Sequence, residues 1–415
     1  MGSLRVLAIV LAFGAGLAVF TATRAGAPAS PDLPSPRLRP APLAELRAAV
    51  RSRRPGSETA LASAYLQKAR ETGDLAYHAR AEALLRRALA RDPHDAGAVV
   101  ELGTLAASRH DFRRALSLAR RARALAPGSL ETYPLLVDAL VELGRYRAAE
   151  RALQRFADRR PGLPAYARIS YLRELHGDLA GAADAMRLAV AAGGGAAENV
   201  AAVQVLHGDL EAARGRPEPA ARDYAEALAG VRGFLPALAG RARLAAARGD
   251  LRSAIATMRR VVARLPLPEH VIALGELELA GGRPAAARRT FALVGAQQRL
   301  LAGAGVDTDA ELAVFEASHG APRRAIALGR GAWAAAPGIR SADALGWALT
   351  RAGRPREGLA WAHRALRLGS LDPLLRFHAG IAARGAERRR HLRLALAHGL
   401  AGRPWQSALA REALR

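Results

Sequence analysis

Four histidines recur at equivalent places in the chain: His110, His176, His207 and His319 all fall near the end of a helical segment. Imidazole is a common metal ligand and proton carrier, so a set of this kind could ligate a metal or transfer protons. The end of a helix also suits histidine, because its side chain can bond the last carbonyl groups and interact with the helix dipole. Their regular recurrence favours the second interpretation, that of helix-end residues.

A second group of histidines lies near the C-terminus. His391 and His398 are seven residues apart and could share one face of a helix, with His378 on the preceding helix. No Asp or Glu is convincingly spaced with all three as a further ligand, and the chain contains no Cys. The lack of Cys excludes disulfides, thiolate metal sites and thiol nucleophiles. We therefore expect no metal and no cofactor.

Sequence motifs of catalysis are missing as well. The run Gly193-Gly194-Gly195 follows no predicted strand and precedes no Gly-Lys-Ser/Thr, so we interpret it as a break between helices and not as a phosphate loop. Neither Gly-x-Ser-x-Gly nor His-Glu-x-x-His occurs. Because the rest of the chain consists of helical repeats, no segment is left for a catalytic domain, and we predict that the protein is not an enzyme.

The helices that would position these residues follow a fixed period. Pro93, Pro127 and Pro161 are separated by 34 residues, and an alanine stands twelve residues before each of them, at Ala81, Ala115 and Ala149. Between the halves of a unit lies a short turn such as Gly144-Arg145-Tyr146. The composition, rich in Ala, Leu and Arg, favours helix over strand. This period predicts stacked helix-turn-helix units.

These units resemble tetratricopeptide repeats, which pair two antiparallel helices, A and B, in 34 residues. The small-residue frame of that family is carried by Gly103, Ala115, Ala122 and Pro127, and again by Gly275 and Ala287. The Trp usual near the start of helix A is absent, with Tyr133 as the nearest substitute. The resemblance covers about residues 57–402 and implies an all-α, right-handed superhelical solenoid of about ten units. Residues 403–415 are predicted to form a C-terminal capping helix.

In the family that the chain resembles, helix A lines the concave face and helix B the convex one. The predicted A helices carry many of the acidic residues, whereas the predicted B helices carry most of the arginines. We expect a neutral to acidic groove that binds an extended or helical segment of a partner protein, with Tyr171 and Trp347 as aromatic anchors. The alternative is that these charges merely solvate helix faces. The predicted groove residues are Thr104, Glu131, Asp138, Glu142, Tyr171, Glu174, Asp209, Arg243, Glu276 and Trp347.

The formal net charge of +25 is typical of proteins that bind nucleic acid. Here it carries less weight, because Lys68 is the only lysine and the arginines are spread along the whole chain. Nucleic acid would also require a basic groove. We therefore treat a basic surface that binds nucleic acid or an acidic polymer as an alternative function.

The N-terminus has the form of an export signal. Arg5 precedes an apolar run over residues 6–20, and Ala25-Gly26-Ala27 has the small-residue form of a cleavage site, although Pro28 hinders cleavage there. Residues 1–27 are thus predicted to be a signal peptide or, if uncleaved, a membrane anchor over residues 6–23. A misassigned start codon is the other interpretation. Six prolines make residues 28–42 an extended linker, and a short helix is expected within residues 43–56.

The sequence thus predicts a non-catalytic scaffold for protein–protein interaction, located outside the cytoplasm. Its partners are protein segments held in the concave groove. Two alternatives stay open: an accessory subunit of a membrane or enzyme complex, and a basic surface that binds nucleic acid or acidic polymer.

Overall fold

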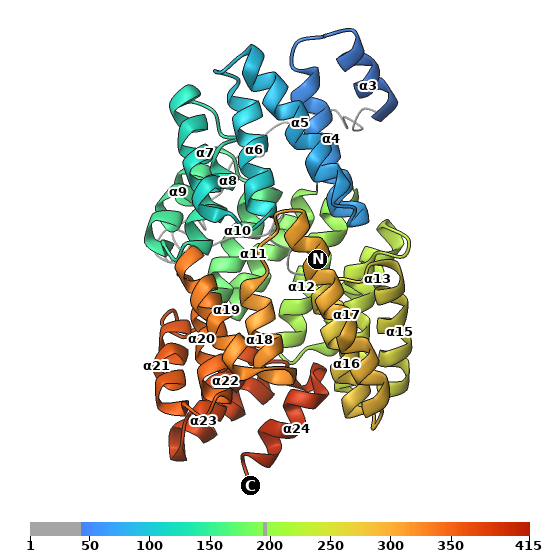
Figure 1. Ribbon diagram of the computed structural model, residues 1–415, viewed down its shortest axis with the longest axis vertical. Helices are drawn as coiled ribbons and strands as arrows, with labels where there is room; N and C mark the ends of the chain where they lie inside the picture. The colour runs from blue at the N-terminus through green and yellow to red at the C-terminus, as the bar shows by residue number, and fades with distance from the viewer. Residues whose placement is uncertain (1–42, 194–196) are drawn as a thin grey trace, which may run out of the picture.

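Ten antiparallel helix pairs follow one another in the computed structural model, which describes residues 43–193 and 197–415 (Figure 1). The predicted all-α solenoid of about ten helix-turn-helix units is confirmed. A short helix, α3 (Leu43–Arg51), precedes them. Units 1 to 10 are α4 (Ser57–Thr72) with α5 (Ala76–Arg91), α6 (Ala96–Ser108) with α7 (Phe112–Leu125), α8 (Tyr133–Glu142) with α9 (Tyr146–Arg159), α10 (Leu163–Leu175) with α11 (Leu179–Ala192), α12 (Ala197–Ala213) with α13 (Pro217–Gly230), α14 (Leu235–Ala247) with α15 (Leu251–Arg264), α16 (Pro268–Ala280) with α17 (Pro284–Gly303), α18 (Asp309–His319) with α19 (Pro322–Ala335), α20 (Ile339–Arg351) with α21 (Pro355–Ala365), and α22 (Pro373–Ala382) with α23 (Gly385–Ala397).

The turn between the helices of one unit is built from local chemistry. In unit 4, Gly177 adopts a left-handed φ of 79°, which costs glycine little, and ends helix α10. Asp178 then accepts a hydrogen bond from the backbone N–H of Gly181 and so caps α11. Asp250 caps α15 in the same way. The Gly-Asp turns of the sequence therefore end one helix and begin the next.

Small residues let the helices approach closely. A Cβ added to Gly103 on α6 would lie 3.2 Å from the Cβ of Leu118 and would overlap the Leu135 side chain of the next unit. Ala115 on α7, opposite, has no exposed surface. The A helices are buried on most sides, as in α20, where all residues from Ser341 to Leu349 are buried. The B helices bury a single face, as in α7.

The C-terminal segment closes one end of the array. After α23 come a short 3₁₀ helix, η1 (Leu400–Gly402), and α24 (Pro404–Glu412). The ring of Trp405 on α24 lies 4.6 Å from that of His319 on α18, and Gly402 lies against the backbone of Arg243 on α14. The C-terminal segment therefore covers its own neighbours and also reaches back to unit 6 through η1 and to unit 8 through α24.

One hydrophobic core joins units that are far apart in sequence. It runs from Ala106 through units 3 and 4 to Leu210, and it also includes Ile339, Ala342 and Leu375 of units 9 and 10. Figure 1 accordingly shows α19 and α20 directly below α8–α10. The superhelix thus closes on itself after one turn.

The predicted signal or anchor (residues 1–27) and linker (28–42) lie outside the described residues, as does most of the Gly193–Gly195 break. Within the described part of the chain, no helix is both long enough and apolar enough for a membrane span.

Candidate functional site

Units that are far apart in sequence meet in a regular order where the superhelix comes round on itself. In the following, a turn is the short link between the two helices of one unit. The turn of unit 2 contacts the loop that enters unit 8, where Asp307 donates its backbone N–H to the carbonyl oxygen of Arg109 at 3.0 Å. The turn of unit 3 contacts the loop that enters unit 9, where the hydroxyl oxygen of Tyr146 accepts a hydrogen bond from the backbone N–H of Ile339 at 3.0 Å. Each turn therefore meets a loop that belongs six units further along.

The same order continues to the C-terminus. In unit 4, a Cβ on Gly177 would lie 2.7 Å from the carbonyl oxygen of Gly369, in the loop that enters unit 10. In unit 5, His398 of the C-terminal segment donates from Nδ1 to the carbonyl oxygen of Ala213 at 3.0 Å. We call this line of contacts, from Arg109/Asp307 to Ala213/His398, the seam. It joins the turns within units 2 to 5 to the loops that enter units 8 to 10 and to the C-terminal segment.

Four of the predicted groove residues do not lie on an open surface. Trp347 is 1% exposed, donates from Nε1 to Ser318 at 2.9 Å and stacks on the ring of His378 at 4.3 Å. Tyr171 is 6% exposed at the seam. The expectation that these two rings are accessible anchors is therefore wrong, because the closed superhelix packs them into its interior.

The two buried acidic groove residues have partners within the protein. The carboxylate of Asp138 accepts two hydrogen bonds from Arg168 on α10, at 2.6 and 2.5 Å. Glu276 faces His319, whose Nε2 lies 3.1 Å from the Glu276 carboxylate. Both acids are less than one-tenth exposed, so they hold adjacent units together instead of meeting solvent.

The remaining groove residues are scattered. Asp209 accepts hydrogen bonds from Arg243 and Tyr224, and Glu131 is an exposed residue paired with Arg160. Thr104 donates to a carbonyl group of its own helix. Glu174 is partly exposed, and burial together with the charge of Asp372 raises its pKa to about 7. Among the ten residues, the structure brings Glu142 close to Tyr171, and Asp209 close to Arg243.

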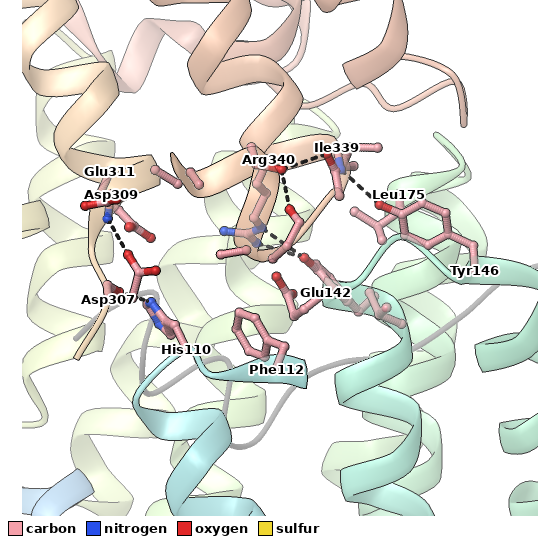
Figure 2. Close-up of a pocket in the computed structure, with 18 residues that line it drawn as sticks. His110, Phe112, Glu142, Tyr146, Leu175, Asp307, Asp309, Glu311, Ile339 and Arg340 are labelled. Atoms are coloured by element: carbon pink, nitrogen blue, oxygen red, sulfur yellow. Dashed lines mark hydrogen bonds between the residues drawn. The ribbon is translucent and has the colours of Figure 1, made fainter. Parts of the chain in front are cut away.

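A pocket opens in the seam around Glu142 (Figure 2). Its empty volume, open mouth included, is about 680 Å³. Apolar and aromatic walls come from α7, α8, α9, α10, α19 and α20. Its charged lining residues come from both sides of the seam: Glu142 and His110 from units 3 and 2, Asp307, Asp309 and Glu311 from the segment entering unit 8, and Arg340 from α20. We call this the seam pocket.

Negative charge dominates the seam pocket, since four carboxylates face one guanidinium. Burial, together with the neighbouring Asp307 and Glu311, raises the pKa of Asp309. Burial also raises the pKa of Glu142, and its Oε1 has neither accessible surface nor a hydrogen-bond partner among the described residues. Arg340 directs its guanidinium to the hydroxyl oxygen of Tyr171, at 2.9 and 3.2 Å. A pocket with this charge balance favours a cationic ligand.

The other polar groups of the pocket serve the fold. Ser341 donates to the carbonyl oxygens of Ala336 and Gly338, and His110 donates from Nδ1 to the carbonyl oxygen of Asp307. In the described ranges 43–193 and 197–415, no three His, Asp or Glu side chains are grouped as a metal site would require.

The sequence pattern places Tyr146 only in a turn between helices and gives no signal for Arg340, so neither is predicted as a site residue. A weak signal for the seam did exist. The repeat spacing is loose between Leu300 and Gly305, and there α17 extends over 20 residues and leads into the loop that carries Asp307. The irregular stretch forms one side of the seam.

The chain is similar to known repeat proteins. Residues 106–170 match the model of the tetratricopeptide repeat family. Among solved structures, a tetratricopeptide repeat protein from Parabacteroides merdae is 17% identical, with 59% of this chain and 96% of that chain covered and a TM-score of 0.43. The human IFIT1 dimer with m7Gppp-AAAA is 15% identical, with 79% and 76% covered and a TM-score of 0.50. No curated protein matches the chain.

Proposed function

We propose that this tetratricopeptide repeat protein is a non-catalytic scaffold outside the cytoplasm whose seam pocket binds a positively charged segment of a partner protein. Protein binding is what the repeat fold supports in general. The export of the chain rests on the N-terminal sequence, with its apolar run over residues 6–20.

The charge balance of the seam pocket carries this proposal. A lysine or arginine side chain would bring a cation to Glu142, Asp309 and Glu311, which Arg340 alone does not neutralise. Charge-assisted hydrogen bonds to carboxylates are among the stronger polar contacts in proteins. The aromatic rings of Phe112 and Tyr146 line the same pocket, and the faces of aromatic rings attract cations.

A basic outer surface supports a second candidate, the binding of an acidic polymer or nucleic acid. Helix α7 carries five arginines and no acidic residue, and Arg113, Arg114, Arg120 and Arg121 are exposed. IFIT1, a structural neighbour, was solved with a capped RNA fragment. The acidic seam pocket disfavours a phosphate backbone, so such binding would involve the convex face.

The test compares peptides of opposite charge on the full chain. We expect arginine- or lysine-rich peptides to bind and to be released as salt rises. Acidic peptides should not compete with them for the seam pocket. The double variant D309N/E311Q should bind the cationic peptides about tenfold more weakly, which corresponds to about 1.4 kcal/mol.

The matched control removes two acids elsewhere. Asp158 and Asp184 are exposed on the outer helices α9 and α11, so D158N/D184N changes the net charge equally but leaves the pocket intact. Equal loss of binding in both double variants would contradict a specific pocket. Preferred binding of RNA, lost when arginines of α7 are replaced, would favour the second candidate.

A further inference from the structure

A second cavity lies at the end of the seam where unit 1 faces units 5 and 6. Its walls are Gln67 and Arg70 of α4, the start of α12, the loop 231–236 and Arg264 at the end of α15. Its empty volume, open mouth included, is about 760 Å³. We call it the basic pocket.

Three arginines and one acid provide the charge of the basic pocket: Arg70, Arg232 and Arg264 against Glu198. Glu198 accepts a hydrogen bond from Gln67 at 3.2 Å, and Gln67 accepts one from Nε of Arg70 at 3.1 Å. Arg264 donates to the carbonyl oxygen of Gly233 at 3.3 Å. Arg232 and Arg264 are exposed, so both guanidinium groups can reorient toward a ligand. The charge balance is the reverse of that in the seam pocket.

The backbone adds to the positive field. Helix α14 begins at Leu235, and its N-cap residue, Phe234, makes no side-chain capping bond. Residues 233–236 line the pocket, so the uncapped positive end of this 13-residue helix faces it. The partial positive charge of this helix end adds to the charge of the arginines, which is the larger of the two.

Apart from Asn199 and Gly233, the remaining lining is apolar. Val205, Val231, Phe234, Leu235 and Pro236 form the rest of the wall, beside Ala202. An ion such as free phosphate would leave this surface unused, whereas an anionic group attached to an apolar body would bury it.

We propose that the basic pocket binds an oxyanion, a carboxylate or a phosphate, carried on an apolar group. Arg232 and Arg264 would contact the anion, since guanidinium groups match the planar oxygen pairs of carboxylate and phosphate. The apolar group would lie against Phe234 and Val231. This site is separate from the seam pocket and opposite in charge. A test of this proposal therefore does not depend on the proposed function.

Titration calorimetry on the full chain at constant ionic strength tests the proposal. The two probes are phenyl phosphate and N-acetyl-leucine, which present a phosphate and a carboxylate on apolar groups. At least one should bind saturably with one site per chain, and the comparison between them identifies the preferred oxyanion. Inorganic phosphate should bind more weakly than phenyl phosphate.

The variant R232Q/R264Q should weaken binding of the preferred probe at least tenfold, because each arginine contributes charge-assisted contacts. The control R252Q/R289Q removes two exposed arginines of α15 and α17 that do not line the pocket, and its affinity should stay within twofold. If the double variant loses its cooperative melting transition, R232Q alone replaces it, because Arg232 is exposed. The proposal is overturned if neither probe saturates, or if the pocket variant and the control behave alike.

Discussion

Two regions of the molecule, the seam along units 2 to 5 and the open end at unit 1, differ in the contacts that join units far apart in sequence. Along units 2 to 5, backbone groups and buried side chains meet, and one core includes residues of such distant units. At unit 1, the apolar residues of α4 belong to one cluster, whereas those of α12 to α14 belong to other clusters, with the basic pocket between them. The side chains of Gln67 and Glu198 bridge this gap. A repeat array with uniform units can therefore be tightly packed between distant units at one place and leave a pocket between them at another.

The largest effect on stability is expected from replacing one of two glycines by alanine. Both glycines lie in the turn between the two helices of a unit. Gly144 and Gly215 both have a left-handed φ, of 68° and 75°, so alanine costs about 1 kcal/mol of backbone strain at either position. At Gly144 the added Cβ would also collide with the carbonyl oxygen of Pro337, whereas nothing lies near Gly215. We expect Gly144→Ala to lower the free energy of unfolding by about 3 kcal/mol in urea titrations. Equal losses in both variants would contradict a tight seam.

A smaller effect is expected from one hydroxyl group at the seam. Tyr146→Phe leaves the buried N–H of Ile339 without its acceptor, which costs about 1–3 kcal/mol. Tyr166→Phe is the matched control, because Tyr166 is partly exposed and no seam contact involves it. Denaturant midpoints of the two variants measure the difference, and an unchanged midpoint for Tyr146→Phe would show that the seam does not form.

A third comparison concerns how the stability of the protein depends on pH. The pKa of Glu174 is raised to about 7, so the folded protein holds this proton more tightly than the unfolded chain. Stability from this group is therefore present at low pH and is lost as the pH rises from about 4.5 to 7, by on the order of 1 kcal/mol. Glu174→Gln should flatten the dependence of the melting temperature on pH in this window. The exposed Glu131→Gln should leave it unchanged.

The smallest effect is expected at the open end. Gln67→Ala removes the hydrogen bond to the partly exposed Glu198, so we expect a loss of about 0.5 kcal/mol or less in the free energy of unfolding. A loss as large as that of Gly144→Ala would show that unit 1 is held as firmly as units 2 to 5.

The sequence predicts the repeat units but not the closure of the superhelix. The 34-residue period, the Gly-Asp turns and residues such as Gly103 act within one unit or between neighbours, so local patterns predict them. The seam joins residues about 170 to 220 positions apart, as in Tyr171 with Arg340 and Arg113 with Ala334. Small rotations between successive units decide whether such residues meet, and no spacing in the sequence encodes their sum.

The same reasoning explains the outcome for the predicted groove. Helix A spacing predicts Asp138 and Trp347 as groove residues, but the closed superhelix buries both side chains. The acids of the segment 307–311 are among the acidic residues of the predicted A helices, and the fold brings them to Glu142.

Hydrogen exchange at the amide of Ile339 tests the closed superhelix most directly. Ile339 is the first residue of α20, and the first N–H groups of a helix have no partner within it. In an open solenoid this amide would therefore exchange rapidly. The account predicts protection comparable to that of core amides in α20, lost selectively in Tyr146→Phe. Fast exchange at Ile339 in the unaltered protein would contradict the seam.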